Sequence, residues 1–184
     1  HYLTVGFPDE FSTIIKKAAA AKGADANLIK SLIKQESGFS PTATSTSNAM
    51  GLMQMIEPTA REIAQDLSIK NLQIPGDLFK PATNVPMGTH YLVKMMLKFN
   101  QHVPLSLAAY NAGPFRLEKW LKARPSLKDL PQIRSSRAMD ELWIEELPWR
   151  ETQVYVKSIL RNLVIYRMLE SGRVELKDPS WQGQ

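Results

Sequence analysis

The residue whose type and position could do acid chemistry is Glu36, within the stretch DANLIKSLIKQESGF that begins at Asp25. Apolar residues recur at helical spacing before it: Leu28, Ile29, Leu32 and Ile33. Glu36 continues the same stripe, and Gly38 predicts that the helix ends just after it. Apolar surroundings and the negative end of the helix dipole would both raise the pKa of Glu36 above its ordinary value of about 4.3. The carboxyl would then stay protonated at neutral pH, as a general acid requires.

A glutamate at the end of a helix is more often solvated or paired with a lysine or arginine, so the helix pattern alone does not decide between the two interpretations. Other short motifs follow along the chain: GLMQ at 51–54, AAYNAG at 108–113, and EELP at 145–148 leading into Glu151 and Thr152. With QES at 35–37 they make four motifs in a fixed order.

These four motifs, in this order and at this spacing, resemble the soluble lytic transglycosylases with a goose-type lysozyme-like fold. The resemblance implies an all-α, lysozyme-like single globular domain over residues 1–184, with a substrate groove. It also implies a substrate, the glycan strand of peptidoglycan, cut between N-acetylmuramic acid and N-acetylglucosamine. The 6-hydroxyl of the muramic acid closes on its own anomeric carbon, so that a 1,6-anhydro end forms and no water is consumed.

In what the resemblance implies, Glu36 acts first as acid and then as base. Six further residues match positions that hold the sugars or orient the acid: Ser45, Met53, Gln54, Tyr110, Asn111 and Glu145. The sequence alone gives most of them ordinary alternatives, namely a loop serine, a core methionine, a core tyrosine and a solvated glutamate. One departure from the family is that Ile56 and Glu57 stand where relatives usually have methionine and proline.

Glycoside cleavage generally needs two carboxylates, and Glu57, Glu62 and Glu145 are candidates for the second by type alone. None of them sits in a motif that would fix it opposite Glu36, which fits the single-carboxylate chemistry of the family. Two rival functions remain open: a lysozyme-like hydrolase on the same fold, and a non-catalytic glycan-binding module. No cofactor or metal is expected, because His90 and His102 are isolated and lack the spacing of a metal site.

The 184 residues carry a net charge of +5 and no cysteine, which excludes disulfides and thiolate chemistry. A basic chain favours a polyanionic partner: nucleic acid, an anionic membrane surface or the carboxylate-bearing cell wall. We expect no nucleic acid, because no ladder of aromatic and basic residues and no DNA-binding motif is present. No apolar run reaches the roughly 20 residues of a transmembrane segment. We expect a monomer.

The chain begins with histidine rather than methionine and shows no charged-then-apolar signal segment. We therefore expect a fragment of a longer precursor, and from the family resemblance a location in the periplasm or cell envelope.

Helices are the elements that must position these side chains, since no strand-like alternation, internal repeat or linker occurs. Helical segments are predicted at 9–22, 25–37, 58–67, 84–100, 104–112, 114–121 and 151–170, with a further helix end at 142–147 stopped by Pro148. Polar residues predict loops at 40–50, which carries Ser45, and at 124–136.

Overall fold

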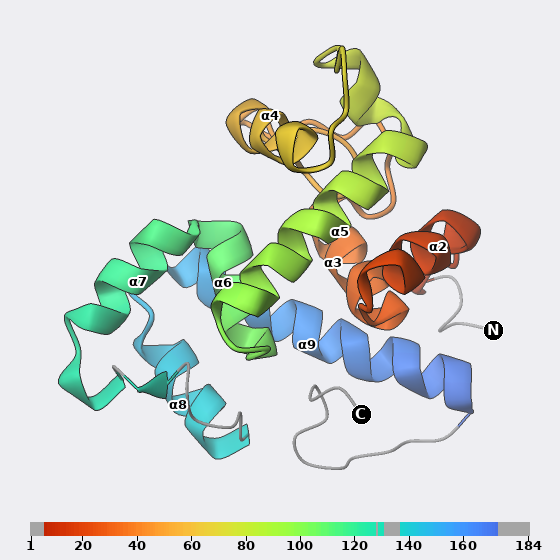
Figure 1. Cartoon of the computed structure of the whole chain (residues 1–184). Helices are drawn as coiled ribbons and strands as arrows, with labels where there is room; N and C mark the ends of the chain where they lie inside the picture. Colours follow the sequence, from red (N-terminus) through yellow and green to blue (C-terminus); the bar gives the residue numbers. More distant parts are fainter. Residues whose placement is uncertain (1–5, 128, 131–136, 173–184) are drawn as a thin grey trace. The chain divides into compact units, whose positions relative to one another are not determined.

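The computed structural model describes residues 6–127, 129–130 and 137–172 as helices joined by loops (Figure 1). Within these residues there is no β-strand, only two isolated bridges, Thr44 with Met50 and Met50 with Met55. The predicted all-α fold class is confirmed. Much of the predicted connection at 124–136 and most of the tail lie outside the described residues. In the described part, no helix combines the length and apolar character needed to cross a bilayer.

The α-helices, in chain order, are α2 (Ser12–Lys22), α3 (Ala26–Ser37), α4 (Glu57–Asp66), α5 (Pro81–Lys98), α6 (Val103–Ala112), α7 (Pro114–Lys122), α8 (Arg137–Glu146) and α9 (Arg150–Ser171). Two short 3-10 helices, η1 (Gly76–Phe79) and η2 (Pro125–Leu127), complete the described elements. The chain divides into two compact units, residues 1–91 and 92–184, which are described separately. A single domain over 1–184 stays a prediction.

Most predicted helices are present, with shifted ends that have local causes. Helix α2 begins at Ser12 instead of residue 9, because Phe11 has a left-handed backbone (φ 57°) that an α-helix cannot contain. Helix α5 begins at Pro81, three residues before Asn84, since a proline at the first helical position gives up an N–H that would have no helical partner. The 3-10 helix η1 was not predicted, because four residues are too few to show a period.

In the first unit, α2 packs against α3, the helix that carries Glu36 (Figure 1). Every residue from 27 to 33 in α3 is buried, so this helix is enclosed on most of its surface. The Asp25 side chain caps its start by accepting a hydrogen bond of 2.7 Å from the backbone N–H of Asn27. Gly38, with φ 58°, ends it as predicted.

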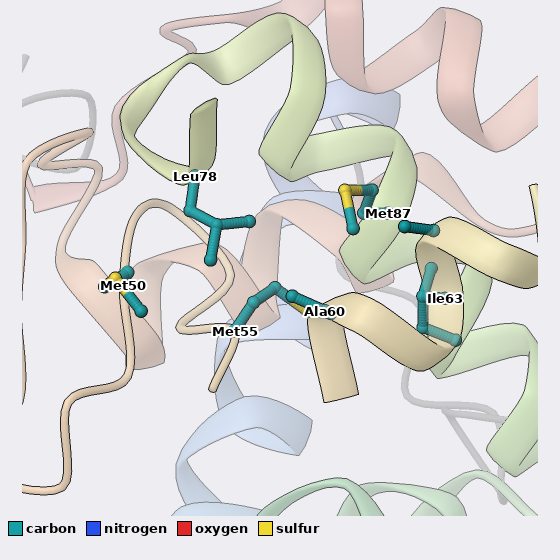
Figure 2. Packing of buried hydrophobic residues seen from close by; sticks show 7 residues of the cluster. Met50, Met55, Ala60, Ile63, Leu78 and Met87 are labelled. Atoms are coloured by element: carbon teal, nitrogen blue, oxygen red, sulfur yellow. The ribbon is translucent and has the colours of Figure 1, made fainter. Parts of the chain in front are cut away.

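A second cluster of the first unit buries the methionines that flank the 51–54 segment. Figure 2 shows its side chains, which come from the loop, α4, η1 and α5: Met50, Met55, Ala60, Ile63, Leu78 and Met87. Methionine fills irregular gaps in a core because its side chain is flexible and polarisable. Met50 and Met55 are therefore core residues of the first unit.

In the second unit, α6 packs against α7 and α9, and α8 packs against α9 (Figure 1). Residues 103–110 of α6 are all buried. His102 caps this helix: its Nδ1 accepts a 3.4 Å hydrogen bond from the backbone N–H of Leu105. Its Nε2 lies 3.2 Å from Oδ1 of the buried Asp140, which also accepts a hydrogen bond from Trp143. His102 is therefore a structural residue, one of the two alternatives that the sequence left open.

Candidate active site

Glu36 lies in the last turn of α3, one residue before the helix ends, and its side chain is half-buried. The predicted position at the carboxyl end of the helix is confirmed, so Glu36 lies at the negative end of the helix dipole. Its raised pKa stays a prediction. The apolar residues that precede it on the helix stripe, Ile29, Leu32 and Ile33, are fully buried.

Ser37, the next residue, joins the end of α3 to the GLMQ segment. Its Oγ donates a 2.9 Å hydrogen bond to the backbone carbonyl of Leu52 and lies 3.2 Å from that of Ile33. A hydroxyl carries one proton, so the contact with Leu52 is the stronger of the two. The backbone beside Glu36 is therefore fixed to residues 51–54, which lie 15 residues further along the chain.

Gln54 holds the same segment from within. Its Nε2 donates hydrogen bonds to the carbonyls of Gly51 (2.8 Å) and Ala43 (3.1 Å). The residue itself has φ 47°, an unusual backbone angle for a side chain other than glycine. The amide thus fixes a tight loop, while its assignment to substrate binding stays a prediction.

Met53 is fully buried and packs against Gly88 of α5. A Cβ on Gly88 would lie 2.6 Å from the sulfur of Met53, so only glycine leaves room for this side chain. The thioether is a packing group in this structure. Its predicted contact with sugar stays a prediction.

Ser45 is exposed in the predicted loop at 40–50. Its Oγ accepts hydrogen bonds from the backbone N–H groups of Ser47 (3.2 Å) and Ala49 (3.0 Å). This arrangement is the ordinary way in which a serine shapes a turn. Its predicted role near the acid stays a prediction.

Tyr110 and Asn111 lie at the carboxyl end of α6, in the second unit. Tyr110 is buried, and Asn111 is half-buried. The Oδ1 of Asn111 accepts a 2.7 Å hydrogen bond from the hydroxyl of Thr152 in α9. Gly113, with φ 87°, separates α6 from α7 directly after them.

Glu145 lies on α8 with an exposed side chain that forms an ion pair with Lys157 of α9. Gln153 secures its backbone by donating hydrogen bonds of 2.9 Å to the carbonyl of Glu145 and 2.7 Å to that of Leu147. Of the other carboxylates considered as a second catalytic group, Glu57 is exposed and pairs with Arg61, and Glu62 is exposed. None of the three is buried.

The structure groups these residues by unit: Glu36, Ser45, Met53 and Gln54 are in the first, and Tyr110, Asn111 and Glu145 in the second. Sequence reasoning missed the residues that hold the site residues in place: the side chains of Ser37, Asn84 and Thr152, and the space that Gly88 leaves for Met53. Ser37 and Thr152 stood inside quoted motifs, but nothing in the sequence named their partners. Among the described residues, no three acidic, histidine or cysteine side chains form a group that could hold a metal ion.

Comparison with known proteins decides the family. The family described as "Transglycosylase SLT domain" matches residues 13–133. The chain belongs to this SLT domain family. Its resemblance to the soluble lytic transglycosylases, inferred from four motifs, is confirmed.

Several relatives are similar to this SLT domain over most of its length. The soluble lytic murein transglycosylase of Escherichia coli K12 is 32% identical over 184 residues, which cover 100% of this chain and 27% of the relative. Two solved structures are 32% identical: the lytic transglycosylase Slt of Pseudomonas aeruginosa, an inactive Glu-to-Gln mutant (TM-score 0.80), and the 70-kDa enzyme of E. coli (TM-score 0.79). The match to the Pseudomonas structure covers 94% of this chain, and the match to the E. coli structure covers 91%. Each match covers 26% of the relative's chain. The chain therefore spans about a quarter of the length of these relatives.

Proposed function

We propose that this SLT domain is a peptidoglycan lytic transglycosylase that uses Glu36 first as acid and then as base. The observation that carries the proposal is the placement of Glu36: a half-buried carboxyl in the last turn of a buried helix, joined through Ser37 to the GLMQ segment. The family supports it, because relatives similar over the whole chain are named lytic murein transglycosylases. The inactive Glu-to-Gln mutant of the Pseudomonas relative also supports dependence on one glutamate.

In the proposed reaction, protonated Glu36 donates its proton to the oxygen that links N-acetylmuramic acid to N-acetylglucosamine. The bond from that oxygen to the anomeric carbon breaks, and the N-acetylglucosamine leaves with a free hydroxyl. The 6-hydroxyl of the muramic acid then bonds to the anomeric carbon, and its proton passes to the Glu36 carboxylate. The acid is restored, no water is consumed, and a 1,6-anhydro end results.

The location of Glu36 suits the first step of this cycle. The negative end of a helix dipole disfavours a negative charge, so it favours the protonated carboxyl. In the proposal six residues hold the sugars or orient the acid: Ser45, Met53, Gln54, Tyr110, Asn111 and Glu145. The domain would act as a monomer, without metal or cofactor, on peptidoglycan in the periplasm or cell envelope.

The decisive variant is Glu36→Gln, which keeps the size of the side chain but removes the transferable proton. We expect the rate of release of soluble fragments from purified peptidoglycan to fall by about 10²–10⁴-fold. A matched control is Glu57→Gln, which removes an exposed carboxylate paired with Arg61 and should retain the parental rate. Circular dichroism and thermal melting of both variants would show that the fold is kept. Normal turnover by Glu36→Gln would refute the assignment.

Mass spectrometry of the products separates the two rival functions from the proposal. A transglycosylase gives ends that are one water lighter than those of a hydrolase, because no water enters the product. Products of full mass would show a lysozyme-like hydrolase. Binding to peptidoglycan without any product, in the parental protein, would show a glycan-binding module.

A further inference from the structure

Asn84 of α5 is fully buried, and three hydrogen bonds of its carboxamide hold neighbouring backbone. Its Oδ1 accepts a 2.7 Å hydrogen bond from the backbone N–H of Met53. Its Nδ2 donates 2.9 Å hydrogen bonds to the carbonyls of Met50 and Leu78. A single side chain thus fixes both ends of the turn at residues 50–53 and connects that turn to η1.

The N–H of Met53 and the carbonyl of Leu52 belong to one peptide unit. That unit donates to Asn84 at its nitrogen and accepts from Ser37 at its oxygen. Hydrogen bonds on the two sides of a peptide polarise each other, so each becomes stronger when the other is present. The connected atoms are therefore Asn84 Oδ1, the 52–53 peptide and Ser37 Oγ, and Ser37 directly follows Glu36 in the chain.

Close packing on both sides leaves the 52–53 peptide little freedom to move. A Cβ on Gly51 would lie 2.1 Å from the carbonyl oxygen of Leu78 and 2.4 Å from Nδ2 of Asn84. On the other side, Gly88, one turn after Asn84 in α5, leaves space for the buried Met53 side chain. The glycines let the two segments approach closely enough for Asn84 to reach the loop.

We propose that Asn84 is a positioning residue for the cleavage reaction: through the 52–53 peptide and Ser37 it fixes the last turn of α3, and so the place of the Glu36 carboxyl. The inference rests on the proposed function of Glu36. A general acid must lie within about 2.6–3.2 Å of the atom that it protonates. A displacement of about 1 Å can lower a rate by about 10²-fold, so the turn that holds the acid matters for kcat.

The test measures kcat and KM on a soluble peptidoglycan tetrasaccharide, by the rate at which the anhydro product appears. Asn84→Ala removes all three hydrogen bonds, and we expect kcat to fall by about 10–100-fold while KM changes by less than about threefold. Ser37→Ala should lower kcat in the same way, and Ser37→Thr, which keeps a hydroxyl, should restore most of it. The control is Asn162→Ala, which removes another buried amide, in the second unit, and should keep the parental kcat.

Asn84→Asp distinguishes positioning from mere stability. Its Oδ1 can still accept from the N–H of Met53, but its other oxygen faces the carbonyls of Met50 and Leu78. The melting temperature should therefore fall at least as far as in Asn84→Ala, whereas kcat, measured below both melting temperatures, should stay closer to the parental value. If kcat instead follows the melting temperature across these variants, Asn84 is only structural.

The double variant Ser37→Ala/Asn84→Ala tests whether both residues act through one peptide. We expect its kcat to match the lower of the single variants within about threefold, because either change breaks the same connection. A loss equal to the product of the single losses would overturn the proposal. If an Asn84 variant does not fold, an unchanged kcat in Ser37→Ala overturns it equally. Activity in Glu36→Gln would refute the proposed function, whereas a multiplying double variant with an inactive Glu36→Gln refutes only the role of Asn84.

Discussion

Under the proposed function, Glu36 and its neighbour Ser37 have separate tasks, although they share the last turn of α3. The carboxyl of Glu36 is half-buried, while the hydroxyl of Ser37 bonds to the carbonyl of Leu52. A group that transfers a proton has to meet its substrate, so its position depends on the backbone that carries it. Ser37, Gln54 and Asn84 make hydrogen bonds that fix the loop at residues 51–54 beside this turn.

Gly51 lies where the backbone and its neighbours leave no room for a side chain. It has φ 78°, and a Cβ there would meet the carbonyl oxygen of Leu78, which is backbone and cannot swing aside. The left-handed angle and the overlap together should lower the free energy of unfolding of Gly51→Ala by about 2–5 kcal/mol. Urea denaturation followed by circular dichroism measures this loss.

Gly76→Ala is the matched control for that substitution. It lies in η1 of the same unit, without a positive φ, and nothing would come within 4 Å of an added Cβ. Its free energy of unfolding should stay within about 1 kcal/mol of the parental value. Equal effects of the two substitutions would contradict the packing argument.

At the scale of elements, α3 is notable for a charge on its buried surface. Lys30 is buried, with only 7% of its surface exposed. Its ammonium forms an ion pair with Asp9, which precedes α2 and has a largely exposed side chain. The hydrogen bond from Lys30 holds the pKa of Asp9 below its ordinary value of 3.8. The pair therefore joins the segment before α2 to the middle of the helix that carries Glu36.

This pair gives a pH-dependent prediction. Because the pKa of Asp9 is lower in the folded protein, its contribution to stability is complete above about pH 4 and is lost as the pH falls below 3.8 through the lowered value. Asp9→Asn removes this ion pair and should lower the free energy of unfolding at pH 6. The loss should be only about 1 kcal/mol, because solvent screens the exposed carboxylate. The difference in free energy of unfolding between the parental protein and Asp9→Asn should shrink towards pH 2.5.

Thermal melts of the parental protein and Asp9→Asn between pH 2.5 and pH 6 would check it. Glu10→Gln, which removes the exposed carboxylate one residue later, is the control and should leave the melting temperature nearly unchanged at every pH. A difference for Asp9→Asn that stays constant down to pH 2.5 would contradict the ion-pair argument.

For the whole molecule, the balance of 23 basic against 18 acidic residues leaves a net charge of +5. Under the proposed function the partner is a polymer that carries carboxylates, so opposite charges should strengthen the association. The contribution is long-ranged and does not depend on any single side chain. It should therefore respond to salt, whereas the proton transfer at Glu36 is a local event.

The Glu36→Gln variant makes this testable, since it should bind peptidoglycan without degrading it. The Debye length, over which salt screens charges, shortens from about 10 Å at 0.1 M salt to about 3 Å at 1 M. We expect the fraction of protein that sediments with insoluble peptidoglycan to fall several-fold between these concentrations. Peptidoglycan with amidated carboxyl groups, as the control substrate, should bind less and show little salt dependence. Salt-independent binding to both would exclude the electrostatic contribution.

Local patterns determined most of the helices and the position of Glu36 within α3. Apolar periodicity and a following glycine act over a few residues, so the end of α3 at Gly38 could be predicted directly. Where a local angle opposed the pattern, as at Phe11, the predicted boundary was wrong by three residues. The short η1 gave no periodic signal at all.

The sequence by itself determined an all-α chain, its family and the helix that carries the candidate acid. Only the tertiary structure decided that Met53 is buried and which side chains hold the site. Asn84 and Met53 are 31 residues apart, Ser37 and Leu52 are 15 apart, and Thr152 and Asn111 are 41 apart. The physical reason is that helix periodicity and caps depend on near neighbours, whereas these hydrogen bonds form only after distant segments have packed together.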